Sequence, residues 1–360
     1  MPLRKPTLLV AALAAGALLT GGTALSASAA PERADTTMNG SFASAAERYD
    51  VPRDVLVSLG YSETHLDGHQ GKPSQDRGYG VMHLVSNPTR HTLEKAAELT
   101  GTPVAELRRD TDANIHGGAA VLRAYADQLG LNAEQRQDID AWYPVIEKYS
   151  GAKGTAAEFY ADAVYDFLAK GVNGAAPNGE RVTVRPHDVH PDKSSATRSD
   201  TRPKSDDYPD ALWVPANPAN YRQGRTAAID TVVIHVTEGS YAGTISWFQN
   251  PESQVSAHYV VQSSDGEITQ MVRDADTAWH AKSGNASGIG IEHEGYIDDP
   301  SWFTDAMYRS SAALTRHLAD TYGIPLDREH IVGHSEVPGN DHTDPGPNWD
   351  WDTYMSLVTG

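Results

Sequence analysis

The stretch Thr231-Val232-Val233-Ile234-His235-Val236-Thr237 decides the fold of the C-terminal part of the chain. Its first four residues are β-branched, which is typical of a buried strand, and a histidine follows at the end of that run. Similar short strands are predicted at 259–261, 268–272 and 289–291. Ser264-Asp265-Gly266 separates the first two of these strands and predicts a hairpin turn.

A long amphipathic helix is predicted after these strands. Its apolar stripe and its two ends are marked by residues at helical spacing: Met307, Leu314, Leu318 and Tyr322 on the stripe, Thr304 as the N-cap and Gly323 just past the C-terminal end. The order of strands and helices predicts an α/β domain over residues 209–360. In this domain a central mixed sheet is flanked by helices.

The N-terminal half is predicted to be an all-α domain over residues 40–171. Apolar residues recur at helical spacing in three segments, namely Val55, Leu56 and Leu59; Ile115, Ala119, Leu122 and Ala126; and Phe159, Ala163 and Phe167. Residues 172–208 then place prolines among Ser, Asp, Thr and Arg and show no apolar period. This composition is typical of an extended, solvated linker between two domains.

Residues 1–30 are typical of a secretory signal peptide. Arg4 and Lys5 precede an apolar run over residues 8–19, which is too short to span a bilayer, and Ala27-Ser28-Ala29 is a small-x-small cleavage site. No later stretch of the sequence is apolar enough to span a membrane. We therefore expect a secreted protein, located outside the cell or in the cell wall, with no stable membrane association.

Two bulk properties limit the chemistry that the chain can perform. The formal net charge is −19, which argues against nucleic acid as a partner because phosphate neutralisation requires clustered Lys and Arg. The chain contains no cysteine, which excludes disulfides, thiolate metal ligands and a cysteine nucleophile. Any metal site must therefore use histidine and carboxylate ligands.

Histidine and acidic side chains gather in the C-terminal part. His235 ends the strand quoted above, His334 follows Ile331-Val332-Gly333, and Asp344 lies in a proline-rich turn. Two imidazoles and one carboxylate with an open position form a catalytic zinc ligand set, and the same set also suits iron. Because residues so far apart can always be combined on paper, the spacing leaves a second interpretation open. In that interpretation these residues are solvent-exposed histidines and a turn aspartate.

Six short strings in this part follow the order seen in one enzyme family. They are Val233-Ile234-His235-Val236-Thr237, Ser256-Ala257-His258-Tyr259-Val260-Val261, Asp276-Thr277-Ala278-Trp279-His280-Ala281, Ile289-Gly290-Ile291-Glu292, Gly333-His334 and Thr343-Asp344-Pro345-Gly346-Pro347. Together they closely resemble the zinc-dependent N-acetylmuramoyl-L-alanine amidases, whose fold is shared by phage amidases and peptidoglycan recognition proteins. The resemblance covers residues 213–354.

The resemblance implies a role for each matching residue at the centre of the site. His235, His334 and Asp344 match the three zinc ligands, and Glu292 matches the acidic catalytic residue. His342 falls where many members carry lysine, so the chain departs from the family there. A histidine at this position is expected to stabilise an oxyanion when it is protonated, which would make its contribution depend on pH.

Three further residues match family positions around this centre. His258, Trp279 and His280 correspond to supporting or substrate-lining residues rather than to metal ligands. His280 and the neighbouring Trp279 are expected to contact sugar or peptide. The alternative is that the two histidines serve only packing and hydrogen bonding.

The N-terminal half resembles the lysozyme-like lytic transglycosylases over residues 43–167. Three motifs carry the likeness: Leu59-Gly60-Tyr61-Ser62-Glu63-Thr64-His65-Leu66 at a helix end, the turn Gly78-Tyr79-Gly80-Val81-Met82-His83-Leu84, and Asn114-Ile115-His116-Gly117-Gly118-Ala119. The resemblance implies Glu63 as the catalytic acid. However, His83 replaces the family's glutamine, and Thr64 replaces its usual serine. These departures favour the alternative that the domain keeps the fold and binds glycan strands without cleaving them.

These features predict a peptidoglycan hydrolase that uses Zn²⁺ to cleave the amide between N-acetylmuramic acid and L-alanine. One alternative is a peptidoglycan-binding protein without catalysis, and another is glycan-strand cleavage by the N-terminal domain. Catalysis is favoured over binding alone, because non-catalytic relatives usually lose a zinc ligand and this chain keeps all three. The accepted stem peptides and the oligomeric state stay open.

Overall fold

The computed structural model describes residues 37–191, 193 and 203–360. The predicted signal peptide, residues 1–30, lies outside the described residues. Within the described ranges, none of the helices combines the length and the apolarity that crossing a membrane requires.

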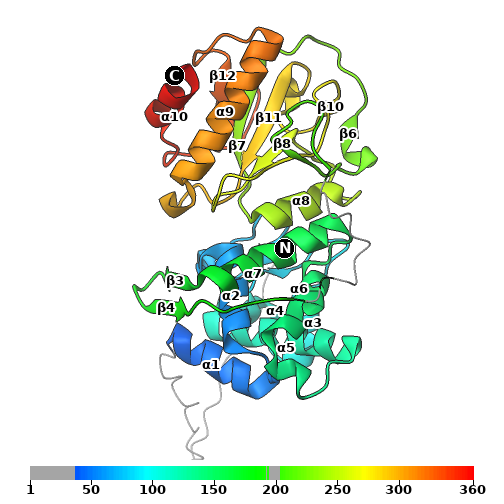
Figure 1. The fold of residues 1–360 in the computed structure, drawn as a ribbon, viewed down its shortest axis with the longest axis vertical. Coiled ribbons are helices and arrows are strands. Elements are labelled where there is room, and N and C mark those ends of the chain that lie inside the picture. The colour runs from blue at the N-terminus through cyan, green and yellow to red at the C-terminus, as the bar shows by residue number, and fades with distance from the viewer. Residues whose placement is uncertain (1–36, 192, 194–202) are drawn as a thin grey trace, which may run out of the picture. The chain divides into compact units, whose positions relative to one another are not determined.

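The N-terminal part of the described chain is helical (Figure 1). Its elements are α1 (Met38–Tyr49), α2 (Arg53–Thr64), α3 (Thr92–Thr100), α4 (Val104–Leu107), α5 (Thr111–Leu129), α6 (Tyr143–Ser150) and α7 (Thr155–Lys170), the 3-10 turns His69–Gly71, Gln135–Gln137 and Ile139–Trp142, and a small sheet of β1 (Gly78–Tyr79) and β2 (Leu84–Val85). The three predicted helical segments correspond to α2, α5 and α7, so the helical character of this part is confirmed. Its likeness to lysozyme stays a prediction.

Residues 172–184 differ from the extended linker that the sequence analysis places there. They form a β-hairpin in which β3 (Val172–Ala175) pairs antiparallel with β4 (Arg181–Val184). Val182 and Val184 are buried while the residues beside them are exposed. One apolar face of the hairpin therefore packs on the helical core. The expectation of an extended, solvated linker is therefore wrong for these residues, because alternate side chains of both short strands are buried against the helical core.

The C-terminal part is a mixed sheet with helices. Its strands are β5 (Leu212–Trp213), β6 (Tyr221–Arg222), β7 (Thr231–Val236), β8 (Tyr259–Val261), β9 (Ile268–Gln270), β10 (Thr277–Ala278), β11 (Gly288–His293) and β12 (Ile331–Gly333). Its helices are α8 (Tyr241–Gln249), α9 (Asp305–Tyr322) and α10 (Trp351–Thr359), with 3-10 turns at Pro218–Asn220, Lys282–Asn285, Pro300–Trp302 and His334–Glu336. The mixed sheet flanked by helices is as predicted.

The main sheet has the strand order β12-β7-β11-β8-β9-β5. Strand β7 pairs in parallel with both β11 and β12, so the strand that carries His235 lies between two partners in the sheet. The predicted hairpin is also present, since β8 and β9 pair antiparallel and Gly266 in the turn has φ +78°. A positive φ of this size is readily adopted by glycine, which explains the residue at this position.

The two faces of the sheet have different partners. On one face, Val232, Ile234, Ile289 and Ile291 pack in the same cluster as the apolar stripes of α9 and α10, which cover this side of the sheet in Figure 1. Val260, on the other face, packs in the cluster that contains α8. Because side chains alternate along a strand, residues next to the first set in β7 and β11 point away from α9.

Helix α9 has the ends that its sequence predicts. The Thr304 side chain accepts a hydrogen bond from the Met307 backbone N–H, and Gly323 ends the helix in the left-handed conformation with φ +72°. The first contact satisfies one of the free N–H groups at the helix start, and the second allows the chain to turn away. These two ends fix the length of the helix that supports the sheet.

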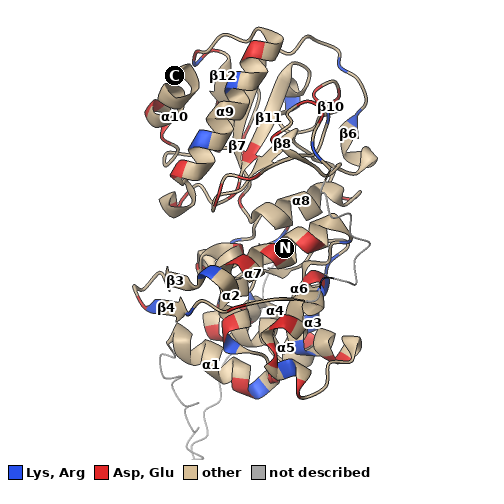
Figure 2. Ribbon diagram, in the orientation of Figure 1, with Lys and Arg blue, Asp and Glu red and all other residues tan. Residues whose placement is uncertain are grey.

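Figure 2 shows Lys and Arg interspersed with Asp and Glu in both parts of the described chain. Several of these residues form exposed pairs one helical turn apart, such as Arg123 with Asp127 and Lys170 with Asp166. Such pairs contribute only a few tenths of a kcal/mol each. The fold therefore depends on its buried apolar clusters and not on surface charge.

We predict that Leu318→Ala destabilises the protein while Leu326→Ala does not. Leu318 on α9 is fully buried against the sheet, whereas Leu326 is 36% exposed. Truncating the buried leucine leaves a cavity and should lower the free energy of unfolding by about 2–5 kcal/mol. The exposed control should change it by less than about 0.5 kcal/mol in urea or thermal unfolding. Equal effects of the two variants would contradict this account of the core.

Candidate active site

Three neighbouring parallel strands bring the predicted site residues into one row. His235 near the end of β7 and Glu292 near the end of β11 are direct partners in the register of the two strands. Gly333 of β12 pairs with Ile234, so His334 follows one position beyond it. All three residues therefore lie at the carboxyl ends of the strands. His235 and Glu292 point away from α9, as the alternation of side chains requires.

Asp344 completes a buried triad with the two histidines. Its carboxylate oxygens lie 3.2 Å from His235 Nδ1 and 3.1 Å from His334 Nδ1. One ligand atom from each residue lies within 4.8 Å of the others, which is a spacing that can hold a metal ion. Hydrogen bonds and the charges of both histidines outweigh burial and hold the pKa of Asp344 well below its usual range. Asp344 is therefore deprotonated, as a metal ligand must be.

Glu292 is a buried carboxylate facing the triad. It is 5% exposed, and its Oε2 atom has no hydrogen-bond partner among the described residues. Burial raises the pKa of Glu292 well above its ordinary value, and the carboxylates of Asp344 and Glu238 raise it further. An unpaired, basic carboxylate in a cavity is typical of a group that accepts a proton from a reactant.

His280 contacts one of the two histidines of the triad. Its Nδ1 atom lies 2.9 Å from Nε2 of His235, while the other ring nitrogen of His235 faces Asp344. A hydrogen bond to the second nitrogen fixes the ring orientation and the tautomer of a ligand histidine. A Cβ atom on Gly290 would lie 2.6 Å from the His280 ring, so this position of β11 is glycine because the imidazole occupies the space.

The triad opens into a cavity of about 480 Å³. Trp279, His280 and His342, which the sequence analysis proposes for the site, line this cavity together with the triad and Glu292. His342 is 59% exposed, and its ring stacks on that of His334 with the centroids 4.4 Å apart. An exposed imidazole in the lining of the cavity is compatible with the role expected for His342.

His258 does not line this cavity. It is fully buried, where Arg225 Nη2 donates to its Nε2 at 2.7 Å and the Gly290 N–H donates to its Nδ1 at 3.0 Å. These contacts join β8 to β11 and hold the strand that carries Glu292. The structure therefore places His258 as a supporting residue, which is one of the two roles considered for it.

Glu63 lies in the helical part and is only 1% exposed. Its Oε2 atom accepts a hydrogen bond from Ser240 Oγ at 2.8 Å and lies 3.2 Å from His83 Nδ1. Ser240 is the N-cap residue of α8, so Glu63 is covered by the C-terminal part of the chain. In this arrangement a glycan strand has no access to the carboxylate of Glu63.

Several lining residues of the cavity were not found from sequence. They come from other segments and include Pro73, Ser74, Gln75, Glu238, Phe248, Lys282 and Asn285. Lys282 pairs with Asp341, next to His342. Many family members carry lysine at the position of His342, whereas Lys282 comes from a different part of the sequence, and no local spacing indicates that it lies near His342.

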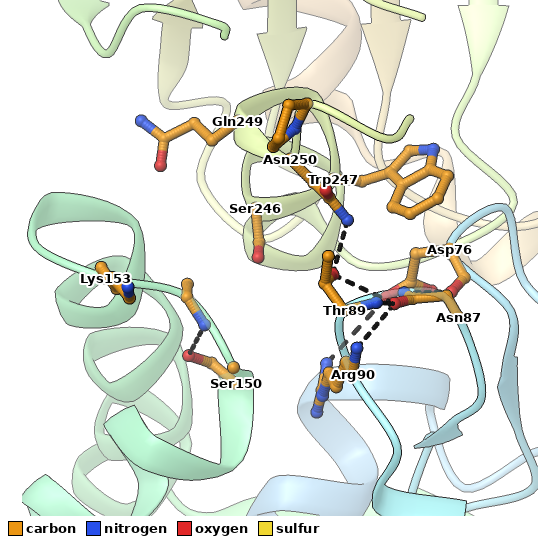
Figure 3. Close-up of a pocket in the computed structure, with 13 residues that line it drawn as sticks. Asp76, Asn87, Thr89, Arg90, Ser150, Lys153, Ser246, Trp247, Gln249 and Asn250 are labelled. Carbon is orange, nitrogen blue, oxygen red and sulfur yellow. Dashed lines mark hydrogen bonds and ion pairs between the residues drawn. The ribbon is translucent and has the colours of Figure 1, made fainter. Parts of the chain in front are cut away.

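A second cavity, of about 300 Å³, lies next to α8 and contains none of the triad residues (Figure 3). Asn250 at the end of α8 donates to Thr89 Oγ1 at 2.6 Å across its rim. Asn87 accepts hydrogen bonds from the backbone of Thr89 and Arg90 and thereby shapes the loop on the other side. This cavity shows that α8 contacts the loops of the helical part as well as the sheet.

A buried histidine–histidine–aspartate triad beside an unpaired carboxylate is typical of metal-dependent hydrolases. The N-acetylmuramoyl-L-alanine amidase family matches residues 225–347 of this chain, a range that contains the triad and Glu292. N-acetylmuramoyl-L-alanine amidase A of Achromobacter lyticus is 42% identical over 173 residues, which are 43% of this chain and 96% of that protein. The chain therefore belongs to the N-acetylmuramoyl-L-alanine amidase family.

Other relatives match a shorter stretch. The 1,6-anhydro-N-acetylmuramyl-L-alanine amidase AmpD of Haemophilus influenzae is 38% identical over 115 residues, which are 30% of this chain and 60% of AmpD. A crystal structure of a selenomethionine AmpD derivative is similar to 43% of this chain over 99% of its own, with 28% identity and a TM-score of 0.36. The family match begins at residue 225, so it does not include the helical part.

We predict that the triad binds a divalent metal ion and that Asp344→Ala removes most of it. Asp344 is the only carboxylate of the triad, and without it two imidazoles remain as ligands. Asp352→Ala, an exposed aspartate in the first turn of α10, is the matched control. Metal content after dialysis against trace metal is the measurement. Equal metal content in the two variants would show that Asp344 is not a ligand.

Proposed function

We propose that this protein is a zinc-dependent hydrolase that cleaves the amide between the lactyl group of N-acetylmuramic acid and L-alanine in peptidoglycan. The observation that carries the proposal is that the unpaired Glu292 carboxylate lines the same cavity as the His235–His334–Asp344 triad. The relatives named above act, by their names, on N-acetylmuramoyl-L-alanine and on its 1,6-anhydro form. Peptidoglycan or its muropeptide fragments are therefore the proposed substrate.

The donor set of the triad suits zinc. Two imidazole nitrogens and one carboxylate oxygen that converge in a buried site leave a fourth position for a reactant, which is the pattern of catalytic zinc. A zinc ion held there would act as a Lewis acid toward the amide carbonyl and toward water. His280 would keep the His235 ring in the orientation that coordination requires, through the 2.9 Å contact.

Glu292 is the proposed proton carrier of the reaction. Water attacks the amide carbon, and the Glu292 carboxylate takes the proton that the water releases. When the carbon–nitrogen bond breaks, Glu292 returns this proton to the leaving nitrogen of L-alanine. The products are a lactyl carboxylate on the sugar and a peptide with a free amino terminus. The raised pKa of Glu292 favours the first transfer, because a more basic carboxylate accepts a proton more readily.

His342 is the proposed donor to the oxyanion that forms on the former carbonyl oxygen. Its ring lies at the exposed rim of the cavity, 3.7 Å from Asp344 Oδ1 and stacked on His334. A donor aimed at the developing negative charge stabilises the transition state more than the substrate. The exposed position allows the imidazole to move toward the substrate when it binds.

We predict that the protein releases free stem peptides with an L-alanine amino terminus from purified sacculi. Mass spectrometry of the digest identifies the products. A chelator should abolish the release and added zinc should restore it, because the triad depends on the metal to activate the substrate. Cut glycan strands as the sole products, unaffected by chelator, would contradict the proposal and assign the activity to the helical part.

We predict that Glu292→Gln keeps the metal but lowers turnover by about 10²- to 10⁴-fold, since the amide cannot accept the proton from water. Glu329→Gln, at an exposed position before β12, is the matched control and should retain full activity. The measurements are metal content and kcat on a soluble muropeptide. Full turnover by Glu292→Gln would exclude this residue as the proton carrier.

A further inference from the structure

One wall of the amidase cavity comes from outside the family match. Pro73, Ser74 and Gln75 of the helical part line the same cavity as His235 and Glu292. They lie about 150 residues before the first residue of the family match, at 225. The reaction described above assigns no role to this loop, which connects the 3-10 turn His69–Gly71 to β1.

The loop is fixed against the edge of the catalytic sheet. The backbone N–H of Gln75 donates to the backbone oxygen of Glu238 at 2.9 Å. Glu238 also lines the cavity, and its side chain accepts from the Ile297 N–H at 2.9 Å. Glu238 lies two residues after the end of β7, the strand that carries His235. The backbone of Gln75 is therefore fixed close to the end of this strand, although Gln75 is exposed.

A buried polar network supports the loop from below. Ser74 Oγ donates to Asp76 Oδ1 at 2.6 Å and lies 2.8 Å from His83 Nε2. The other nitrogen of His83 lies 3.2 Å from Glu63 Oε2, and Glu63 in turn accepts from Ser240 at the start of α8. The network therefore connects the loop through two buried side chains to the helix that packs beside the amidase cavity.

The charges of this network stabilise the contacts between His83 and its two acidic neighbours. Burial by itself lowers the pKa of His83, but the flanking carboxylates of Glu63 and Asp76 outweigh burial and raise it. A protonated His83 forms ion pairs with both acids, and such a buried, fully paired group is costly to take apart. Glu63 is therefore engaged in holding His83, and His83 holds the loop.

The side-chain amide of Gln75 is available to a ligand. Gln75 lines the cavity and is exposed, and its side chain has no hydrogen-bond partner among the described residues. A glutamine amide offers both donors and an acceptor, which match the C=O and N–H of a secondary amide. The proposed substrate carries such amides on both sides of the scissile bond, in the acetamido group of the sugar and in the stem peptide.

We propose that the loop Pro73–Gln75 is a substrate-binding wall of the amidase cavity, that Gln75 hydrogen-bonds to a neutral amide group of the substrate, and that His83 positions this loop. This inference rests on the function proposed above. It makes Gln75 a specificity-determining residue for the amidase reaction. It also makes the helical part a component of the amidase site.

The test compares Gln75→Ala with Gln128→Ala in the full-length chain. Gln128 is an exposed glutamine on α5 that does not line the cavity. With N-acetylmuramoyl tripeptide as substrate, Gln75→Ala should raise KM about two- to tenfold and leave kcat nearly unchanged, the effect of one lost neutral hydrogen bond. The control should keep wild-type values.

Two truncated substrates identify the amide that Gln75 contacts. If the contact is to the sugar, Gln75→Ala has no effect on a muramoyl tripeptide that lacks the N-acetyl group. If the contact is to the peptide, it has no effect on N-acetylmuramoyl-L-alanine. Equal KM values for Gln75→Ala and the control on every substrate would overturn this inference alone. A wild-type protein that releases no peptide from any of them would overturn the proposed function and, with it, this inference.

A double-mutant comparison tests the positioning role of His83. His83→Gln breaks the pair with Glu63 and should raise KM as Gln75→Ala does, with metal content unchanged. If His83 acts through the loop, combining the two substitutions adds little to the larger single effect, because both remove the same contact. Multiplied effects of the two changes would show that His83 has a merely structural role. The Gln75 comparison decides the main inference even if His83→Gln fails to fold.

Discussion

The parallel pairing of β7 with β11 and β12 is the constraint on which the rest of the structure depends. Backbone register places His235 opposite Glu292 and sets His334 one position past the partner of Ile234. Shifting any of the three strands by one residue would turn its functional side chain toward α9. The buried apolar residues on the α9 face, such as Val232 and Ile291, prevent this shift, since they would then lose their partners.

The site is built from supporting contacts that reach across the sheet. His258 joins β8 to β11, and His280 occupies the space that the missing side chain of Gly290 leaves and contacts His235. His280 and Asp344, both distant from His235 in sequence, thus hold its imidazole in place. Metal sites generally need such outer contacts to orient their ligands. Here they also fix the strand that carries the proposed proton carrier.

Much of the C-terminal part could be predicted from sequence because its signals are local. The β-branched run at 231–234, the hairpin around Gly266 and the capped helix α9 each follow from neighbouring residues, and the structure contains all three. Predicting the triad also required the resemblance of six short strings to the amidase family. The spacing of its three residues alone did not distinguish a metal site from exposed side chains. The hairpin at 172–184 and the lining loop at 73–75 have no comparable local signal. The strands of the hairpin are only four residues long and lie among prolines, and the loop reaches the cavity through tertiary contacts.

The wide separation of the site residues along the chain has a consequence for biosynthesis. His235, Glu292, His334 and Asp344 come together only through non-local pairings, and such contacts form late in folding because closing long loops is entropically unfavourable. Strand β12 and the turn at Asp344 follow every other strand of the main sheet in sequence, so they are synthesised after those strands. A nascent or partly folded molecule therefore lacks a complete catalytic centre. Hydrolysis therefore becomes possible only after the whole sheet has assembled.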